Sequence, residues 1–357
     1  MPAYREGNGT WTVQCYYHDE SGENRHKTKR GFGNQAEAVA WEADFMAKVN
    51  CDMSMTFATF YNLYEADIRP RLKENTWLTK ESIITKKLLP TFGQMRMIDI
   101  TSRDVVNWQN LMLGGYDDAG KPYSQTYLRT INNQLSAMFN HAVKHYGLGR
   151  NPVHSTISIG DRKGPEMKFW TKEQYLRFSE CVMDKPESFY AFEVLYWCGI
   201  RVGELLALTL EDIDFDDKLL HITKSYQRIK CRDVITTPKT PKSKRVISMP
   251  DFLVDELHDY VSSLDYEQRK GRLFPYTKSF LHHEMRRGCK ECGLEPIRIH
   301  DLRHSHVSLL IDMGFTALSI ADRMGHESVD ITYRYAHLFP SMQKEMANAL
   351  NDVSRKF

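Results

Sequence analysis

The sequence predicts a multidomain protein that is mainly α-helical and carries small β-sheets, and three observations support this class. The chain has 357 residues, enough for two or three domains that each bury a core. Residues 11–17 alternate between apolar and polar side chains, which is the period of a half-buried strand. Aromatic side chains between 57 and 64 instead recur at i, i+3, i+4 and i+7, the spacing of an amphipathic helix.

The composition is that of an ordinary folded protein. Apolar residues make up 41% and charged residues 26% of the chain, so wholesale disorder is not expected. No apolar run approaches the roughly 20 residues of a membrane helix, and the first residues lack the apolar core of a secretory signal. The seven cysteines are odd in number and irregularly spaced, which favours reduced thiols in a cytoplasm.

Residues 1–50 form the first predicted domain, a three-stranded sheet with one helix. Residues 19–22 have turn composition and lead into a basic return strand at 25–30. Asn34 is placed to cap a helix that begins at Gln35. A strand face with basic and polar side chains can read a major groove of DNA, although a charged edge strand also protects a purely structural module from aggregation. The candidate DNA-contacting residues of this sheet are Gln14, Tyr16, Arg25, Lys27 and Lys29.

Residues 55–155 form a second, helical domain that begins with the aromatic stripe. Thr101 lies three residues before Asp104, a spacing typical of a helix cap. Another apolar stripe begins at Leu128, and its helix is expected to end before Gly147. These aromatic and aliphatic faces indicate a packed core, and a ligand pocket is the less economical interpretation.

The third predicted domain, residues 165–357, follows a polar linker at 157–168. Just beyond the linker, Thr171 and Gln174 have the spacing of a capping box, flanked by two aromatic residues in the positions of a hydrophobic staple. The segment 342–350 is amphipathic and is predicted to be a final helix. A new folding unit therefore begins near residue 170.

The net charge, 48 − 46 = +2, neither supports nor excludes a polyanionic partner. The distribution of charge is more informative, because eight lysines or arginines between His221 and Met249 accompany the single acid Asp233. Such segregation indicates a basic working surface, with a solvated hairpin as the alternative interpretation. The candidate DNA-contacting residues in this segment are Lys242, Lys244 and Arg245.

The chemistry-bearing residues of the third domain are several cations or histidines and one tyrosine. Two arginines, a lysine and two histidines can surround one phosphate, and the planar guanidinium suits this task best. A tyrosine hydroxyl, with a pKa of about 10, is a weak nucleophile unless such cations lower its pKa and stabilise charge on phosphorus. This phosphoryl transfer needs neither a metal nor another cofactor. The residues are Arg201, Lys239, His300, Arg303, His326 and Tyr335.

In their order and spacing these residues resemble the tyrosine recombinases, the lambda-integrase-like family of site-specific DNA recombinases. The matching motifs are Gly-Ile-Arg-Val-Gly-Glu around Arg201, Lys-Thr-Pro-Lys from Lys239, His-x-x-Arg from His300, Met-Gly-His ending at His326, and Tyr-Ala-His from Tyr335. The resemblance covers nearly the whole chain. It implies an arm-DNA-binding domain at 1–50, a core-binding domain at 55–155 and a catalytic domain at 165–357.

The resemblance also implies roles for the matching residues. Tyr335 attacks a phosphodiester and forms a 3′-phosphotyrosyl link. Lys239 protonates the leaving 5′-oxygen, His300 assists proton movement at the tyrosine, and Glu204 supports the site. The non-bridging oxygens of the phosphate are held by Arg201, Arg303 and His326.

The family resemblance further implies partners and a location. We expect a phage or conjugative-transposon integrase that binds double-stranded DNA at core and arm sites, in the cytoplasm of a bacterial host at its nucleoid. Four copies act together on two duplexes through a Holliday junction. The helix at 342–350 then packs on a neighbouring copy, and DNA-bending and excision factors assist.

Other interpretations stay open on the residues alone. Cys289-x-x-Cys292 precedes His300 and His304 and superficially suggests zinc, but only seven residues separate Cys292 from His300, against about twelve in a zinc finger. A DNA-binding factor without activity and a relaxing topoisomerase are two further alternatives. Three histidines are interpreted as helix or supporting residues rather than catalysts, namely His304, His306 and His337.

Overall fold

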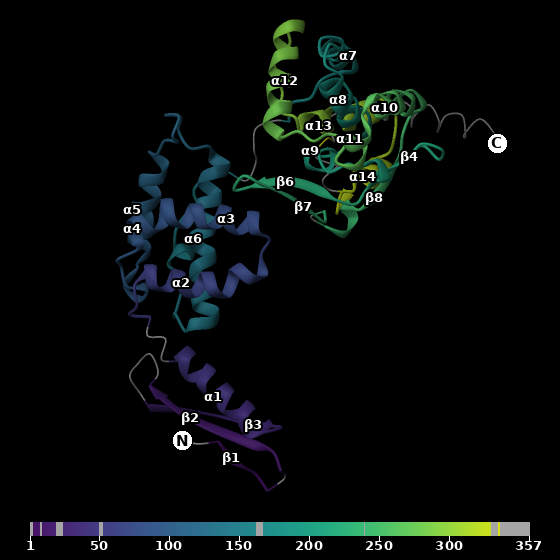
Figure 1. Cartoon of the computed structure of the whole chain (residues 1–357). Helices are drawn as coiled ribbons and strands as arrows, with labels where there is room; N and C mark the ends of the chain where they lie inside the picture. The colour runs from purple at the N-terminus through teal and green to yellow at the C-terminus, as the bar shows by residue number, and fades with distance from the viewer. Residues whose placement is uncertain are drawn as a thin grey trace, which may run out of the picture. The chain divides into compact units, whose positions relative to one another are not determined.

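The structure is a computed structural model that describes residues 3–7, 9–18, 24–49, 53–161, 167–238, 240–329 and 335. The chain divides into two compact units, residues 1–165 and residues 166–357 (Figure 1). Lys239 and the predicted final helix at 342–350 lie outside the described residues. Within the described part of the chain, no helix is long and apolar enough to cross a membrane.

The chain begins with an antiparallel sheet in the order β1-β2-β3 and one helix, α1. Its core contains Val13 and Cys15 from β2 together with Ala38 from α1. The Asn34 side chain accepts a hydrogen bond from the backbone N–H of Glu37 at 2.8 Å, which is the cap that the sequence predicts. The elements are β1 (Tyr4–Arg5), β2 (Trp11–His18), β3 (Asn24–Phe32) and α1 (Gln35–Val49).

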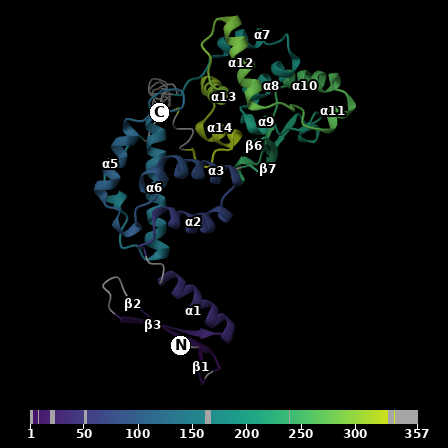
Figure 2. The same cartoon turned by 60° about the vertical axis from the view of Figure 1, so that its left-hand side comes forward.

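The rest of the first unit is helical, and its core is rich in aromatic rings. Phe57 and Phe60 are fully buried, and the long helix α6 contacts α2, α3 and α5 (Figures 1 and 2). Thr101 and Asp104 form the predicted capping box at the start of α5, and Gly147 ends α6 with a φ of 76°. The helices are α2 (Phe57–Ile68), α3 (Glu74–Ile83), α4 (Leu89–Phe92), α5 (Ser102–Leu113) and α6 (Gln125–Tyr146).

The second unit surrounds small antiparallel sheets with helices, and one sheet has the order β4-β5-β8 while β6 pairs with β7. Its strands are β4 (Ile213–Asp214), β5 (Leu219–Ile222), β6 (Ser225–Ile229), β7 (Arg232–Thr236) and β8 (Arg245–Ser248). Its helices are α7 (Lys172–Glu180), α8 (Pro186–Cys198), α9 (Val202–Leu205), α10 (Asp251–Ser263), α11 (Tyr266–Lys270), α12 (Lys278–Cys292), α13 (Asp301–Asp312) and α14 (Ala317–Met324).

Helix α8 is the central helix of the second unit and contacts both α10 and α13 (Figure 1). It ends at Gly199 with a φ of 64°, and a Cβ there would lie 2.5 Å from the His306 ring. Helix α14 ends in the same way at Gly325, where a Cβ would lie 2.7 Å from the carbonyl oxygen of Lys242. Glycine is required at both ends by backbone conformation and by space. The two tight ends carry the chain directly into the candidate site.

The predicted fold class is confirmed by this architecture. Thr171 and Gln174 form the capping box that starts α7, as their spacing predicts.

Cys289 is buried within α12, where its thiol contacts Met285. The part of the chain that the structure describes contains no group of three or more His, Cys, Asp or Glu residues that could hold a metal.

We expect Gly288→Ala to destabilise the second unit, because its new Cβ would lie 2.6 Å from Val182 and 2.7 Å from the Phe178 ring. Both neighbours are fully buried and cannot move aside. An overpacking cost of about 1–3 kcal/mol exceeds the gain of about 1 kcal/mol from replacing a helical glycine. Thermal or urea unfolding should therefore show a net loss.

The matched control for this substitution is Gly271→Ala. The nearest atom to its new Cβ is the Gln268 carbonyl oxygen at an ordinary 3.7 Å. We expect the control to change the free energy of unfolding by less than about 0.5 kcal/mol. Equal stability of the two variants would contradict the packing described for α12.

Candidate active site

The predicted catalytic residues come from separate segments of the second unit. Arg201 directly precedes α9, His300 directly precedes α13, and Arg303 lies in the first turn of that helix. His326 follows the end of α14. Tyr335 is buried, with 4% of its surface exposed, and packs against apolar residues of α13 and α14.

The Glu204 carboxylate is the centre of an ion-pair network at the start of α9. It is 2% exposed and accepts a hydrogen bond from Arg201 Nη1 at 2.7 Å and another from the backbone N–H of Arg201 at 2.9 Å. Arg245 Nη2 donates a hydrogen bond to Oε2 of Glu204 at 2.9 Å. Burial raises the pKa of Glu204, but the hydrogen bonds and charges of the two arginines outweigh it and hold the pKa below its ordinary value. Glu204 therefore carries a negative charge that fixes the Arg201 guanidinium.

Arg245 is a predicted DNA-contacting residue, but its side chain is buried in the structure. Only 6% of its side chain is exposed, and its Nε donates to the Arg323 carbonyl oxygen at the end of α14, at 3.0 Å. The alternation of β8 turns this side chain inward, whereas its neighbours Lys242 and Lys244 are exposed. Arg245 thus ties the β8 strand to Glu204 and α14, and the structure does not place it on the surface.

Arg303 connects the two glycine-ended helices. Its guanidinium donates to the Gly199 carbonyl oxygen at 2.8 Å and to the Met324 carbonyl oxygen at 2.5 Å. Burial lowers the pKa of Arg303 to about 9, and the charges of Arg201 and Arg245 act in the same direction. The side chain therefore stays protonated at neutral pH. The charges of Arg201, Arg245 and Glu204 all act on Arg303, so three guanidinium groups and one carboxylate form a single charged cluster.

The two predicted histidines lie in the same positive environment. Burial lowers the pKa of His326 to about 4, with further lowering by the charges of Arg303 and Arg201. Burial also lowers the pKa of His300, again followed by the charges of Arg303 and Arg201. Both imidazoles are therefore neutral at pH 7 and can donate or accept hydrogen bonds without a proton from solvent.

The Tyr335 hydroxyl contacts His304, one of the three histidines that the sequence interpretation left without a catalytic role. It forms a hydrogen bond with Nδ1 of His304, and the two ring centroids are 5.6 Å apart. His304 follows His300 by four residues, so the two rings share one side of the helix start and meet edge to face at 5.0 Å. That i, i+4 spacing is the signal by which the sequence could have indicated His304.

The candidate DNA-contacting residues of the N-terminal sheet do not share one face. Residues directly opposite in an antiparallel pair lie on the same face, and Cys15 pairs with Lys27 while Val13 pairs with Lys29. Since the core of this sheet contains Val13 and Cys15, the basic residues lie on the side of α1. Lys29 Nζ lies 5.2 Å above the Trp41 ring of that helix.

The open face of the sheet carries a different set. Gln14 pairs with Thr28, and Tyr16 pairs with His26. Tyr16 is 54% exposed. The prediction that Arg25, Lys27 and Lys29 share a face with Gln14 and Tyr16 is therefore wrong, since the pairing register sorts them to opposite faces. The residues on the open face are Gln14, Tyr16, His26, Thr28 and Arg30.

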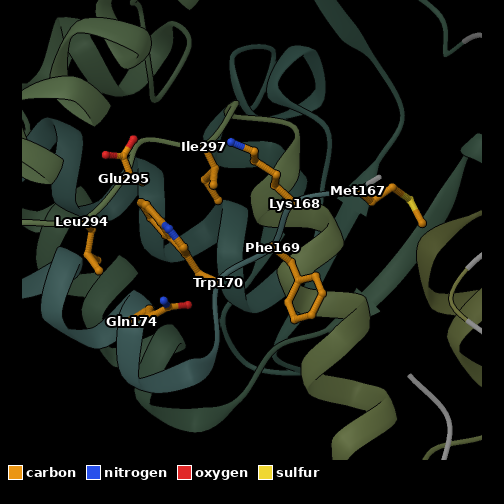
Figure 3. Close-up of a pocket in the computed structure, with 8 residues that line it drawn as sticks. All are labelled: Met167, Lys168, Phe169, Trp170, Gln174, Leu294, Glu295 and Ile297. Atoms are coloured by element: carbon orange, nitrogen blue, oxygen red, sulfur yellow. The ribbon is translucent and has the colours of Figure 1, made fainter. Parts of the chain in front are cut away.

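A shallow apolar pocket also opens in the second unit (Figure 3). Trp170 lies at its centre, with Leu294 and Ile297 beside the indole and the carboxylate of Glu295 at one edge. None of the five candidates that the structure describes lines it, namely Arg201, His300, Arg303, His326 and Tyr335. Four of them instead lie at the ends of α8 and α14 and at the start of α13, and Tyr335 packs against α13 and α14.

Family models match successive parts of the chain. Residues 168–342 match the phage integrase family, residues 56–113 match the N-terminal SAM-like domain of phage integrases, and residues 2–49 match an arm DNA-binding domain. The ICEBs1 integrase of Bacillus subtilis (strain 168) is 30% identical over 369 residues, which cover 97% of this chain and 98% of that protein. The integrase of Staphylococcus phage L54a is 25% identical and covers 69% of this chain, with 82% of its own length matched.

Solved structures share the fold. The Tn1549 transposon integrase in complex with a circular intermediate DNA has a TM-score of 0.69 and 19% identity, covering 85% of this chain and 100% of that chain. A lambda integrase tetramer bound to a Holliday junction has a TM-score of 0.57 and 20% identity, covering 91% of this chain and 95% of that chain.

The fold, the buried arginine cluster and the adjacent tyrosine define a protein of the tyrosine recombinase class. The chain belongs to the phage integrase family and is an integrase of the kind that mobile elements carry. The family, the fold class and the enzyme class that the sequence predicts are thereby confirmed.

We expect Arg245→Met to lower the free energy of unfolding by about 3 kcal/mol at pH 7, because removing one partner of a buried ion pair leaves the Glu204 charge undercompensated. The pKa of Glu204 is lowered in the folded protein. Its contribution is therefore present above the unfolded pKa of about 4.3 and is lost as the pH falls through the folded value. The difference between the two proteins should shrink below about pH 4.

Chemical denaturation of both proteins across this pH range measures the effect. The matched control is Lys244→Met, which removes the exposed charge next to Arg245 and should cost less than about 0.5 kcal/mol. If Arg245→Met were as stable as the control at pH 7, the carboxylate would not depend on this arginine.

Proposed function

We propose that the protein cuts and rejoins DNA strands at specific sites through a 3′-phosphotyrosyl intermediate, with Tyr335 as the nucleophile. The observation that carries this proposal is the position of Tyr335, which is buried and close enough to Arg303 to influence its pKa. Tyr335 also packs against Met324, whose carbonyl oxygen accepts a hydrogen bond from Arg303, so the hydroxyl and this guanidinium belong to one site in the proposal. The reaction integrates a mobile element into a host chromosome and excises it again.

The cationic cluster stabilises the transferred phosphoryl group in this proposal. Arg201, Arg303 and His326 hold the non-bridging oxygens, and Glu204 keeps the Arg201 guanidinium in place through their 2.7 Å contact. As the Tyr335 oxygen bonds to phosphorus, the bond from phosphorus to the 5′-oxygen breaks. Preorganised cations in a buried site stabilise the charge that develops on phosphorus. Because the covalent link conserves the phosphoester, a 5′-hydroxyl of a partner strand reseals the DNA without ATP.

Lys239 donates a proton to the leaving 5′-oxygen in this proposal. The lysine lies outside the described residues, so its role rests on the family resemblance of the Lys-Thr-Pro-Lys motif. General acid catalysis of this kind contributes about 10²–10⁴-fold to a rate. The described end of the motif, Pro241 and Lys242, belongs to a short 3-10 turn (Pro241–Ser243) that precedes β8 and Arg245.

The DNA partner has core and arm sites in this proposal. The arm contact uses the open face of the N-terminal sheet, where Gln14, Tyr16 and Arg30 of the paired strands β2 and β3 share a side, and a pair of antiparallel strands can enter a major groove. Exposed Lys242 and Lys244 contact the DNA backbone near the catalytic centre. The match of residues 2–49 to an arm DNA-binding domain supports this division.

Four copies act on two duplexes in this proposal, as in the lambda integrase tetramer on a Holliday junction. The amphipathic segment at 342–350 is proposed to pack on a neighbouring copy, and DNA-bending and excision factors to control direction. The work takes place at the nucleoid, in the cytoplasm of a bacterial host. The similarity to integrases of a Bacillus element and a Staphylococcus phage supports that setting.

Substituting Tyr335→Phe tests the nucleophile. The variant lacks the hydroxyl and should form no denaturant-resistant protein–DNA adduct on a nicked duplex of the element's end sequence, while its Kd for that duplex changes less than about threefold. Gel electrophoresis under denaturing conditions detects the adduct. The control is Tyr266→Phe, which removes an exposed hydroxyl and should react like the parent. An adduct that survives in Tyr335→Phe would assign the nucleophile elsewhere.

A sulfur atom in place of the bridging 5′-oxygen tests the lysine. Such a leaving group needs little protonation, so Lys239→Ala should cleave the ordinary substrate about 10²–10⁴-fold more slowly and recover on the sulfur substrate. Cleavage rates on the two substrates give the ratio directly. A defect of equal size on both substrates would remove Lys239 from the acid role.

A further inference from the structure

The hydrogen bond between Tyr335 and His304 gives the nucleophile a partner that the motif resemblance does not assign. The side chain of His304 is 14% exposed, so bulk water has little access to this contact. A phenol that attacks phosphorus must lose its proton, and the residue in contact with the hydroxyl is best placed to take it. The contact therefore raises the question of which atom of His304 is available as an acceptor.

The second ring nitrogen of His304 faces a buried carboxylate. Its Nε2 lies 3.9 Å from Oδ1 of Asp301, which is 1% exposed. Arg298 fixes that carboxylate with a 2.7 Å hydrogen bond from Nη2 and a 2.9 Å hydrogen bond from its backbone N–H. A proton on Nε2 is favoured by the negative charge of Asp301, and Nδ1 then carries the lone pair that faces the Tyr335 hydroxyl.

The groups around His304 keep its imidazole neutral before DNA binds. Burial lowers the pKa of His304 to about 4 and is the largest cause. Among the neighbouring charges, His300, Arg298 and Arg303 lower this pKa further, whereas the Asp301 carboxylate raises it. His326 lies near enough for His304 to influence its pKa in turn, and Tyr335 completes the surroundings. A bound phosphate adds a negative charge to this set and shifts the balance toward protonation. The site is thus poised to take a proton only when its substrate is present.

We propose that His304, oriented by Asp301, is the general base that accepts the Tyr335 proton during strand cleavage. The inference rests on the proposed function, because it concerns the same nucleophile. As the tyrosine oxygen bonds to phosphorus, its proton passes to Nδ1 of His304, and the bond to the 5′-oxygen breaks. The imidazolium that forms is stabilised by Asp301. During rejoining the same proton returns to the tyrosine oxygen as the phosphotyrosyl bond breaks.

This arrangement changes the role that the sequence suggests for His300. The His300 ring meets the His304 ring edge to face at 5.0 Å, so it is placed to orient His304. The proposed roles of Tyr335, His304 and Asp301 are those of nucleophile, base and carboxylate in a catalytic triad. Here Asp301 acts on His304 through its charge across 3.9 Å and not through a hydrogen bond. Two of these three residues lie in the first turn of α13, which holds their spacing rigid.

The test is His304→Asn in the full-length protein. The asparagine can keep a hydrogen-bonding atom near the position of Nδ1 but cannot take up a proton. We expect adduct formation on a nicked duplex of the element's end sequence to fall by about 10²–10⁴-fold, with the Kd for that duplex within about threefold of the parent. A matched control is His283→Asn on the exposed side of α12, which should react at the parental rate.

Two further readouts separate a base from a merely structural residue. Between pH 6 and 8 the rate for His304→Asn should rise about tenfold per pH unit, because the phenol must then ionise without help, whereas the parental rate changes little. A bridging 5′-sulfur should leave the His304→Asn defect in place, since it helps the leaving group and not the nucleophile. The same 5′-sulfur substrate is expected to restore the cleavage rate of Lys239→Ala.

The outcomes distinguish this inference from the proposed function. A His304→Asn rate within threefold of the parent, or full rescue by the 5′-sulfur, would overturn the role of His304 while Tyr335→Phe still forms no adduct. An adduct in Tyr335→Phe would overturn both. A slow rate with a flat pH profile would make His304 a positioning residue and would also overturn the proposal.

Discussion

The buried Glu204 carboxylate and the two guanidinium groups that contact it are the interaction on which the site depends. Cations gathered in a place with little water repel one another, and burying them is costly unless a negative charge compensates. Glu204 contacts Arg201 on one side and Arg245 on the other. Arg303 adds a third guanidinium, which is held by backbone carbonyl oxygens. In the proposed mechanism, this preorganised positive charge stabilises the phosphate of the DNA backbone.

This need to stabilise buried arginines explains why the backbone conformation is constrained at the helix ends beside the site. Arg303 donates to carbonyl oxygens at the ends of α8 and α14, and both helices stop at glycines in the left-handed conformation. A side chain at Gly199 would strike His306, and one at Gly325 would strike Arg245 and its neighbouring segment. Helix ends with exposed carbonyl oxygens are natural partners for guanidinium groups. The two helix ends, at Gly199 and Gly325, are therefore constrained both by the space available to a side chain and by the hydrogen bonds of Arg303.

Several features were predictable from the sequence because they depend on residues close together in the chain. The cap at Asn34 and the capping box at Thr171 are local hydrogen bonds, and the aromatic stripe that begins at Phe57 becomes a core because its spacing matches a helical turn. Motif order and spacing were sufficient to indicate the family, which the comparisons confirm. The chemistry of an arginine cluster with one tyrosine follows from residue types alone.

The tertiary structure decided the rest, because those features depend on contacts between distant segments. The register of β2 with β3 places Lys27 and Lys29 on the side of α1, and a shift of one residue would reverse this. The inward direction of Arg245 depends on a partner 41 positions earlier in the chain. The contact of His304 with Tyr335 joins residues 31 positions apart. Local spacing of residues determines which helices and strands form, whereas tertiary packing determines which side chains come into contact. The proposed proton transfer requires one such contact, between Tyr335 and His304.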